Sequence, residues 1–114
     1  MITSRRMLLA VASSAALATA TGAIAQTKDP VKIGVPTALT GTYAQLGDEA
    51  KRAIEFAVAE ANASGGVDGR KVEVRYLDTE AKPELARQQG EKLALSGFNI
   101  LTGAIASGEG LAMG

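Results

Sequence analysis

Two stretches of the chain alternate apolar residues with small or polar ones, and this period of two is typical of a half-buried β-strand. They span residues 31–35 and 71–77. Pro36 follows the first stretch, and we expect it to end that strand because proline has no N–H to donate to the next ladder bond. A shorter apolar run predicts a third strand at residues 99–103.

The segments between these strands repeat their apolar residues at helical spacing. The clearest helix is predicted for residues 48–63, where an apolar stripe runs along one side. The stripe consists of Ala50, Ala53, Ile54, Ala57, Val58 and Ala61. Gly65 and Gly66 stop this helix, since glycine readily takes the left-handed conformation of a helix C-cap. Pro83 suits the first turn of a second helix, predicted for residues 84–96.

Strands that alternate with helices predict an α/β fold, in which a parallel sheet has β-α-β-α-β order and right-handed crossovers. Such sheets bind ligands at the carboxyl ends of their strands. The loops after the first and third strands, residues 37–47 and 104–110, are expected at that edge. Both are rich in hydroxyls and glycines rather than in acids and bases. The chain ends where a third helix is expected to begin.

The first 25 residues have the pattern of a secretory signal peptide. Arg5 and Arg6 give a positive start, residues 7–25 carry no charge, and the small-x-small triplet at residues 23–25 predicts cleavage after Ala25. A transmembrane anchor is the alternative, but serine, threonine and glycine dilute the apolar run. The arginine pair fits a Sec or a twin-arginine signal. Without a lipoprotein cysteine, residues 26–114 are expected to be free in the periplasm.

Composition narrows the possible functions. Twelve basic residues balance twelve acidic ones, so nucleic acid is not an expected partner. The chain has no cysteine and no histidine, which removes thiolate metal sites, the commonest general base and the commonest transition-metal ligand. We therefore expect no metal, no cofactor and no enzymatic activity.

Four short motifs follow one another between residues 32 and 69, and a strand that ends in an acid comes after them. The motifs are Lys32-Ile33-Gly34-Val35-Pro36, Leu39-Thr40-Gly41, Ala44-Gln45-Leu46-Gly47 and Asn62-Ala63-Ser64-Gly65-Gly66-Val67-Asp68-Gly69. In this order and spacing they resemble the opening of leucine/isoleucine/valine-type periplasmic binding proteins, the substrate-binding proteins of ABC transporters. The resemblance extends from about residue 31 to residue 108.

The resemblance implies the type I periplasmic-binding fold, in which two α/β lobes joined by a hinge close over an amino acid or a related small solute. Family members are several times longer, so residues 26–114 are expected to form only part of the first lobe. The implied partner is the membrane permease of an ABC importer. The complete protein is expected to be a monomer.

The resemblance also implies a ligand loop at residues 104–108. Ser107 matches the family's ligand-binding serine at a helix start, and Ala106 and Gly108 lie beside it. A helix N-terminus offers free N–H donors and the positive end of the helix dipole, so it can bind an α-carboxylate. The alternative is that Ser107 is an N-cap residue that serves only its own helix.

Tyr43 and Leu46 belong to the stretch of the first loop that the resemblance matches to the segment touching the ligand's side chain. Many relatives carry an aromatic residue at the position of Leu46. Packing over the strand ends is the alternative role for both residues. Asp78, at the end of the second strand, is better explained as a turn or cap acid than as a ligand contact.

Two other functions remain as alternatives. A sensory or receptor domain of the same fold would be supported by a transmembrane segment downstream. An exported α/β enzyme is disfavoured by the lack of histidine, cysteine and a nucleophile elbow. Gly108, Gly110 and Gly114 follow a strand, but their spacing departs from the dinucleotide fingerprint. The solute stays open among branched-chain amino acids, other amino acids, amides and urea.

Overall fold

A computed structural model describes residues 28–114, so the expected signal peptide and its cleavage after Ala25 lie outside the described residues. The elements follow one another as β1 (Val31–Thr37), α1 (Ala44–Ala63), β2 (Val72–Asp78), α2 (Pro83–Leu95), β3 (Ile100–Leu101) and α3 (Ser107–Met113). The predicted α/β class and the β-α-β-α-β order are confirmed. None of the described helices is long and apolar enough to cross a membrane.

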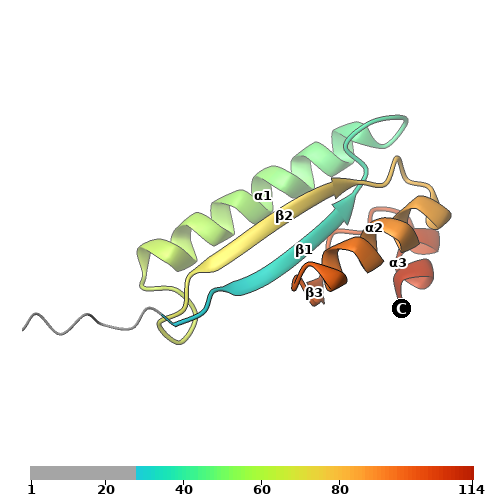
Figure 1. Cartoon of the computed structure of the whole chain (residues 1–114). Helices are drawn as coiled ribbons and strands as arrows, with labels where there is room; N and C mark the ends of the chain where they lie inside the picture. The colour runs from blue at the N-terminus through green and yellow to red at the C-terminus, as the bar shows by residue number, and fades with distance from the viewer. Residues whose placement is uncertain (1–27) are drawn as a thin grey trace, which may run out of the picture.

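The three strands form one parallel sheet with the order β2-β1-β3, so β1 is central (Figure 1). β1 and β2 pair over their full length, from Val31 opposite Val72 to Thr37 opposite Asp78. β3 is short and pairs only at Ile100 and Leu101. Because β1 and β2 end at the same level, the loops that follow them start side by side.

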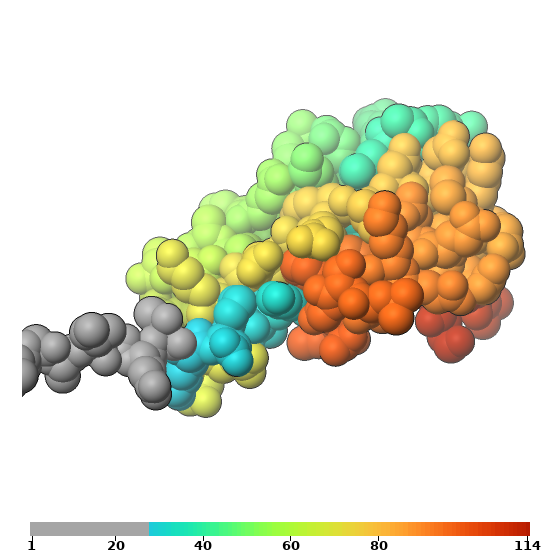
Figure 2. Space-filling model, viewed as in Figure 1, coloured from blue at the N-terminus to red at the C-terminus, as the bar shows by residue number. Residues whose placement is uncertain are grey.

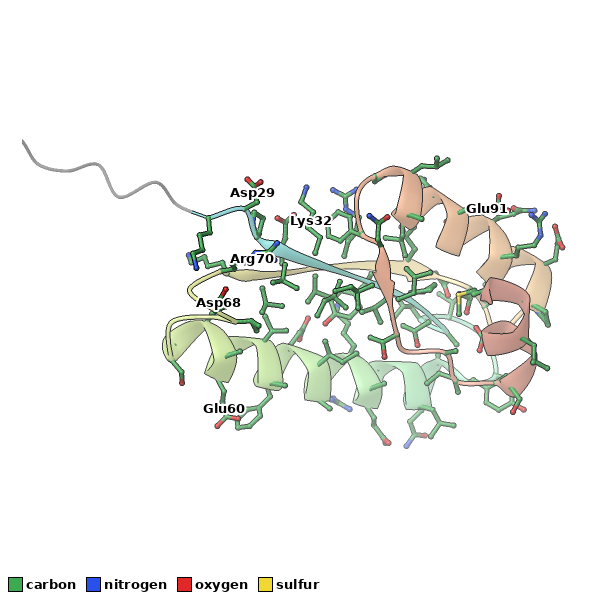
Figure 3. All side chains as sticks on the ribbon, turned by 90° about the horizontal axis from the view of Figure 1, so that it is seen from below. Asp29, Lys32, Glu60, Asp68, Arg70 and Glu91 are labelled. Atoms are coloured by element: carbon green, nitrogen blue, oxygen red, sulfur yellow. The ribbon has the colours of Figure 1, made fainter. Side chains whose placement is uncertain are left out.

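Helices lie on both sides of the sheet: α1 on one side and α2 on the other (Figure 3). The space-filling view in Figure 2 shows α2 closely packed over the near face, with α3 at one end of the molecule. The core on this side is tight because Gly34 has no side chain. A Cβ there would come within 2.8 Å of Leu101 Cδ2 and 3.0 Å of Leu93 Cδ1. Leu93 and Phe98 are buried in this layer.

The α1 side is packed less completely. Ala50, Ile54, Val58 and Ala61 of the predicted stripe are half-buried, whereas Ala53 and Ala57 are exposed. A cavity of about 280 Å³ remains between the helix and the strands. It is lined by Ile33, Ile54, Ala57, Val58, Ala61, Val72 and Thr102. In the described part of the chain, an open apolar groove therefore lies between α1 and the sheet.

Pro36 does not end the first strand, which continues to Thr37. The reason lies in which neighbour each residue of β1 faces. Val31 N–H donates to Lys71 O beside β2, whereas Gly34 O accepts from Thr102 N–H on the β3 side. Even-numbered residues of β1 therefore face β3, and β3 ends at Leu101, opposite Gly34. The missing N–H of Pro36 thus costs no ladder bond.

The first helix begins at Ala44, four residues earlier than expected. Gly41 turns the chain with φ +83°, and Ala44 N–H donates to Gly41 O. Gly47 is not a loop glycine but a buried helical one, where α1 crosses the end of β1. A Cβ on Gly47 would lie 1.6 Å from Ala38 O, so only glycine permits this approach.

Candidate functional site

Three loops leave the sheet at the carboxyl ends of its strands. They are residues 38–43 after β1, 79–82 after β2 and 102–106 after β3. In Figure 1 this edge lies on the right, where α1 begins and where α3 packs beside the start of α2. Open parallel sheets bind their ligands at this edge, so the loops that the sequence singled out occupy the expected place.

The loop after β1 is bound by the carboxylate of Asp78. Asp78 Oδ1 accepts from Leu39 N–H at 2.9 Å and from Thr40 N–H at 3.3 Å, while Oδ2 accepts from the Thr40 hydroxyl at 2.6 Å. Asp78 Oδ1 also accepts from Glu80 N–H at 2.9 Å, within its own turn. Asp78 therefore has the geometry of the turn acid that the sequence favoured.

Two opposing effects act on the pKa of Asp78. Partial burial raises it, and hydrogen bonds from the Thr40 hydroxyl and from the backbone N–H groups of Glu80, Leu39 and Thr40 lower it. The hydrogen bonds prevail together, and the pKa of Asp78 lies below its ordinary value. The ionised form is thus the one that binds the loop.

The loop after β3 is bound by Glu109, whose side chain is completely buried (0% exposed). Glu109 Oε1 accepts from the Thr79 hydroxyl, and Oε2 accepts from Ala106 N–H at 2.8 Å and Ile105 N–H at 3.2 Å. Ala106, the N-cap residue of α3, has no side-chain acceptor. Glu109 therefore supplies the carboxylate half of a capping box by itself.

Asp78 and Thr79 thus connect both predicted ligand loops to the end of β2. Thr79 N–H also donates to Thr37 O at 2.9 Å, which extends the β1–β2 pairing by one bond. Among residues 28–114 no hydrogen bond joins the two loops directly, but both are bound to the same two adjacent residues, Asp78 and Thr79. The end of β2 therefore sets the position of the two loops relative to each other.

Ser107 is the first residue of α3 and is exposed, with Ala106 and Gly108 half-buried on either side. Ser107 is not the N-cap, because Ala106 occupies that position with an extended backbone (φ −101°, ψ 143°). The N–H groups at the start of a helix have no partner within it. Ser107 thus presents a hydroxyl at the surface of this edge. Gly108 packs against Pro83, where a Cβ would come 3.1 Å from Pro83 Cγ.

Tyr43 and Leu46 are half-exposed, at 45% and 49%. The sequence analysis placed both residues in the first loop, but the structure places them at the start of α1. Tyr43 is the N-cap residue of α1, and Leu46 lies in the first turn of that helix. α1 lies on the other face of the sheet from α2 (Figure 3), whereas Ser107 belongs to α3, which packs against α2.

The described cavities do not join these five residues. A cavity of about 400 Å³ lies behind α3, lined by Thr102, Gly103, Ala104 and Met113 among others, and neither Tyr43, Leu46 nor Ser107 lines it. A larger one of about 570 Å³ lies at the amino end of β2, around Lys28 and Asn62. There Asn62 Oδ1 accepts from Val72 N–H at 2.8 Å, and Asn62 Nδ2 donates to Val72 O at 3.0 Å. Asn62 thus has a structural role, because it joins the end of α1 to the start of β2.

Glu109 and Thr79 were missed as site residues by the sequence analysis. One signal for Glu109 was available, because an acid three residues after the N-cap position, here Ala106, is typical of a capping box. Nothing in the local sequence indicates that its other oxygen reaches Thr79, 30 residues earlier. Among residues 28–114, no cluster of three or more histidine, cysteine, aspartate or glutamate side chains is placed to hold a metal ion.

A parallel α/β sheet with its polar loops collected at the carboxyl edge is an arrangement in which many α/β domains bind small molecules. The family model described as "Periplasmic binding protein" matches residues 30–114. The chain therefore belongs to the periplasmic binding protein family. This confirms the family indicated by the sequence motifs.

Individual relatives agree with this assignment. The chain is 37% identical over 78 residues to Leu/Ile/Val-binding protein homolog 2 of Brucella abortus, covering 68% of this chain and 21% of that protein. A periplasmic binding protein type 1 from Bordetella pertussis Tohama I matches with a TM-score of 0.64 and 39% identity, over 74% of this chain and 23% of that one.

A third relative is a solute-binding protein of an ABC transporter from Rhodopseudomonas palustris BisB5, solved in complex with 3,4-dihydroxybenzoic acid. It matches with a TM-score of 0.67 and 26% identity, over 75% of this chain and 23% of that one. The chain spans about a fifth of the length of the curated relatives it matches. These relatives are described as binding proteins, and none of them is described as an enzyme.

Proposed function

We propose that this segment belongs to the extracytoplasmic solute-binding component of an ABC importer. In the complete protein the ligand binds between this lobe and a second one, and hinge closure over the ligand shifts an equilibrium between open and closed forms. The closed form then delivers the solute to the membrane permease. The family assignment and the transporter relatives support this role. A monomeric, periplasmic protein exported through a signal peptide cleaved after Ala25 is part of the same proposal.

The ligand is a small carboxylic acid, with branched-chain or related amino acids as the first candidates. The name of the Brucella relative refers to leucine, isoleucine and valine, and the Rhodopseudomonas relative was solved with an aromatic acid. These ligands differ in their side groups but share a carboxylate. A binding site common to both would recognise that group.

Ser107 is the residue proposed to bind the carboxylate, with the backbone of Ala106 and Gly108 forming the wall beside it. The observation that carries this assignment is that Ser107 is exposed at the first turn of α3 and is not the helix cap. Its hydroxyl and the N–H groups of Ser107 and Gly108 are hydrogen-bond donors without a required partner in the helix. Glu109 N–H, in contrast, already donates to Ala106 O at 3.0 Å. Glu109 already takes the N–H groups of Ile105 and Ala106, so the donors left for a ligand begin at Ser107.

Tyr43 and Leu46 are proposed to contact the ligand's side group from the α1 layer. Both keep about half of their surface exposed at the edge of the sheet. Leucine in place of an aromatic residue at position 46 removes a flat contact surface and leaves an aliphatic one. This chemistry fits an aliphatic side group better than a ring.

Ser107→Ala in the full-length protein tests the proposal. A hydrogen bond to a charged group is worth about 1.5–3 kcal/mol, so the Kd for L-leucine or the best-bound carboxylic acid should rise about 10- to 100-fold. Isothermal titration calorimetry measures the affinity. Ser96→Ala is the matched control, because the Ser96 hydroxyl donates to Lys92 O at the C-terminal end of α2. Gly108, in contrast, packs against Pro83 at the N-terminal end of that helix.

Two results decide the test. Unchanged affinity in Ser107→Ala, with ligand binding intact in the unmodified protein, removes Ser107 from the ligand site. No binding of any L-amino acid, amide or aromatic acid by the unmodified protein overturns the ligand class itself.

A further inference from the structure

The buried carboxylate of Glu109 divides its two oxygens between two tasks. Oε2 accepts from the N–H groups of Ile105 and Ala106, which is all that capping of α3 requires. Oε1 binds the Thr79 hydroxyl, which belongs to the turn after β2. The bond to Thr79 is thus additional to the cap, and it joins α3 to the turn after β2.

The contact between Glu109 and Thr79 is buried, so its polar atoms have no access to water. A carboxylate without water costs free energy unless its oxygens are hydrogen-bonded. Both Glu109 and Thr79 are completely buried at 0% exposure, and Thr79 Oγ1 also accepts from Ala81 N–H at 3.2 Å. Each polar atom of the pair is thus satisfied, as in a rigid, fully connected network.

The contact fixes one end of the loop that leads to Ser107. The other end is fixed by Thr102 N–H, which donates to Gly34 O at 3.0 Å beside β1. Between these points the chain runs through Gly103, which takes φ +94°. The loop thus has a bond to the central strand where it starts and a bond to the end of β2 where it finishes.

We propose that Thr79 and Glu109 are positioning residues for the ligand loop: their buried contact holds residues 103–107 in the form that presents the Ser107 hydroxyl and the N–H groups of Ser107 and Gly108 at the sheet edge. This inference rests on the proposed function for its effect on ligand affinity. Its structural half, the restraint on the loop, is independent of any ligand.

Thr79→Val tests the proposal because valine keeps the shape of threonine and lacks the hydroxyl. In the full-length protein we expect amide exchange at Ile105 and Ala106 to become about tenfold faster and the Kd for L-leucine to rise about tenfold. Thr79→Ser restores the hydroxyl and should return both values to within about twofold of the unmodified protein. Hydrogen exchange resolved by NMR and calorimetry give the two readouts.

Asn62→Ala is the matched control for stability. The Asn62 amide binds Val72 N–H and Val72 O at the opposite end of β2, so its loss lowers the melting temperature without reaching the loop. We expect this variant to keep the exchange rates of Ile105 and Ala106 and the ligand affinity. Equal losses of affinity in Asn62→Ala and Thr79→Val, at equal loss of melting temperature, would overturn the positioning role.

A second test uses the unmodified protein, so it can be carried out even if Thr79→Val does not fold. Without ligand, the amides of Ile105 and Ala106 should exchange more slowly than that of Ser107, because only the first two are bound by Glu109. Equal exchange at the three amides would overturn the proposal. If the protein binds none of the tested solutes, the proposed function fails, whereas the exchange rates still decide whether the restraint exists.

Discussion

Asp78 and Thr79 are neighbours in the sequence, but their side chains bind two different loops. Asp78 binds Leu39 and Thr40 after β1, and Thr79 binds Glu109 of α3. Successive residues of a strand point to opposite faces, so two adjacent side chains at the end of β2 reach opposite layers. A pair of small polar residues can thus organise a whole edge of the sheet.

The lowered pKa of Asp78 predicts a loss of stability in acid. Because the folded-state pKa lies below the unfolded value of about 3.9, this stabilisation is present above that pH and is lost as the pH falls through the folded-state pKa. Asp78→Asn cannot titrate, so the difference in unfolding free energy between the two proteins should be largest at neutral pH and shrink towards pH 3.

Urea denaturation of the full-length protein from pH 7 to pH 3 measures this difference. Asp29→Asn is the control, since Asp29 is an exposed residue at the opposite end of the sheet (Figure 3). A difference between the unmodified protein and Asp78→Asn that does not change with pH would show that the carboxylate charge is not what binds the loop.

At the scale of the elements, the approach of α1 to β1 depends on a single missing side chain. Gly47 lets the first turn of the helix cross the end of the strand at Ala38. This crossing brings Tyr43 and Leu46 to the sheet edge, because Tyr43 is the N-cap residue of α1 and Leu46 lies in its first turn. A glycine in a helix is therefore tolerated here for its size, despite its low helix propensity.

Gly47→Ala should destabilise the protein by about 1–3 kcal/mol or more, because a methyl group at 1.6 Å from Ala38 O forces the helix away from the strand. Thermal or denaturant unfolding measures the cost. Gly110→Ala is the matched control in α3, where the nearest atom to the added Cβ is the Ala104 Cβ at 3.9 Å. That variant should be neutral or slightly stabilising. Equal stabilities for the two variants would contradict the close approach.

At the scale of the whole molecule, the described residues leave large apolar side chains uncovered. Leu95 is 91% exposed and Leu111 83%, and the groove between α1 and the sheet is apolar. β3 pairs only with β1 in the described part of the chain, so its other edge is unpaired. Exposed apolar surface and a free strand edge both favour association with another protein surface.

Residues 26–114 expressed by themselves are therefore expected to be poorly soluble or to associate. Size-exclusion chromatography with light scattering measures the state, and calorimetry measures the melt. We expect oligomers and a broad transition, since the apolar surface is covered only by contact between copies. A monomer with a sharp cooperative melt would contradict this expectation and would show that the segment is stable without further lobe structure.

The order of the elements, the parallel sheet and the edge that carries the polar loops were all determined by the sequence, because periodicity and caps depend on residues a few positions apart. The family motifs, read in order, were also sufficient for the class of protein. Only the tertiary structure decided that Pro36 stays within β1, that Gly47 is a contact and not a loop, and that Glu109 binds Thr79. These features depend on which backbone or side chain from another element packs against each residue, and a local sequence pattern does not specify that neighbour.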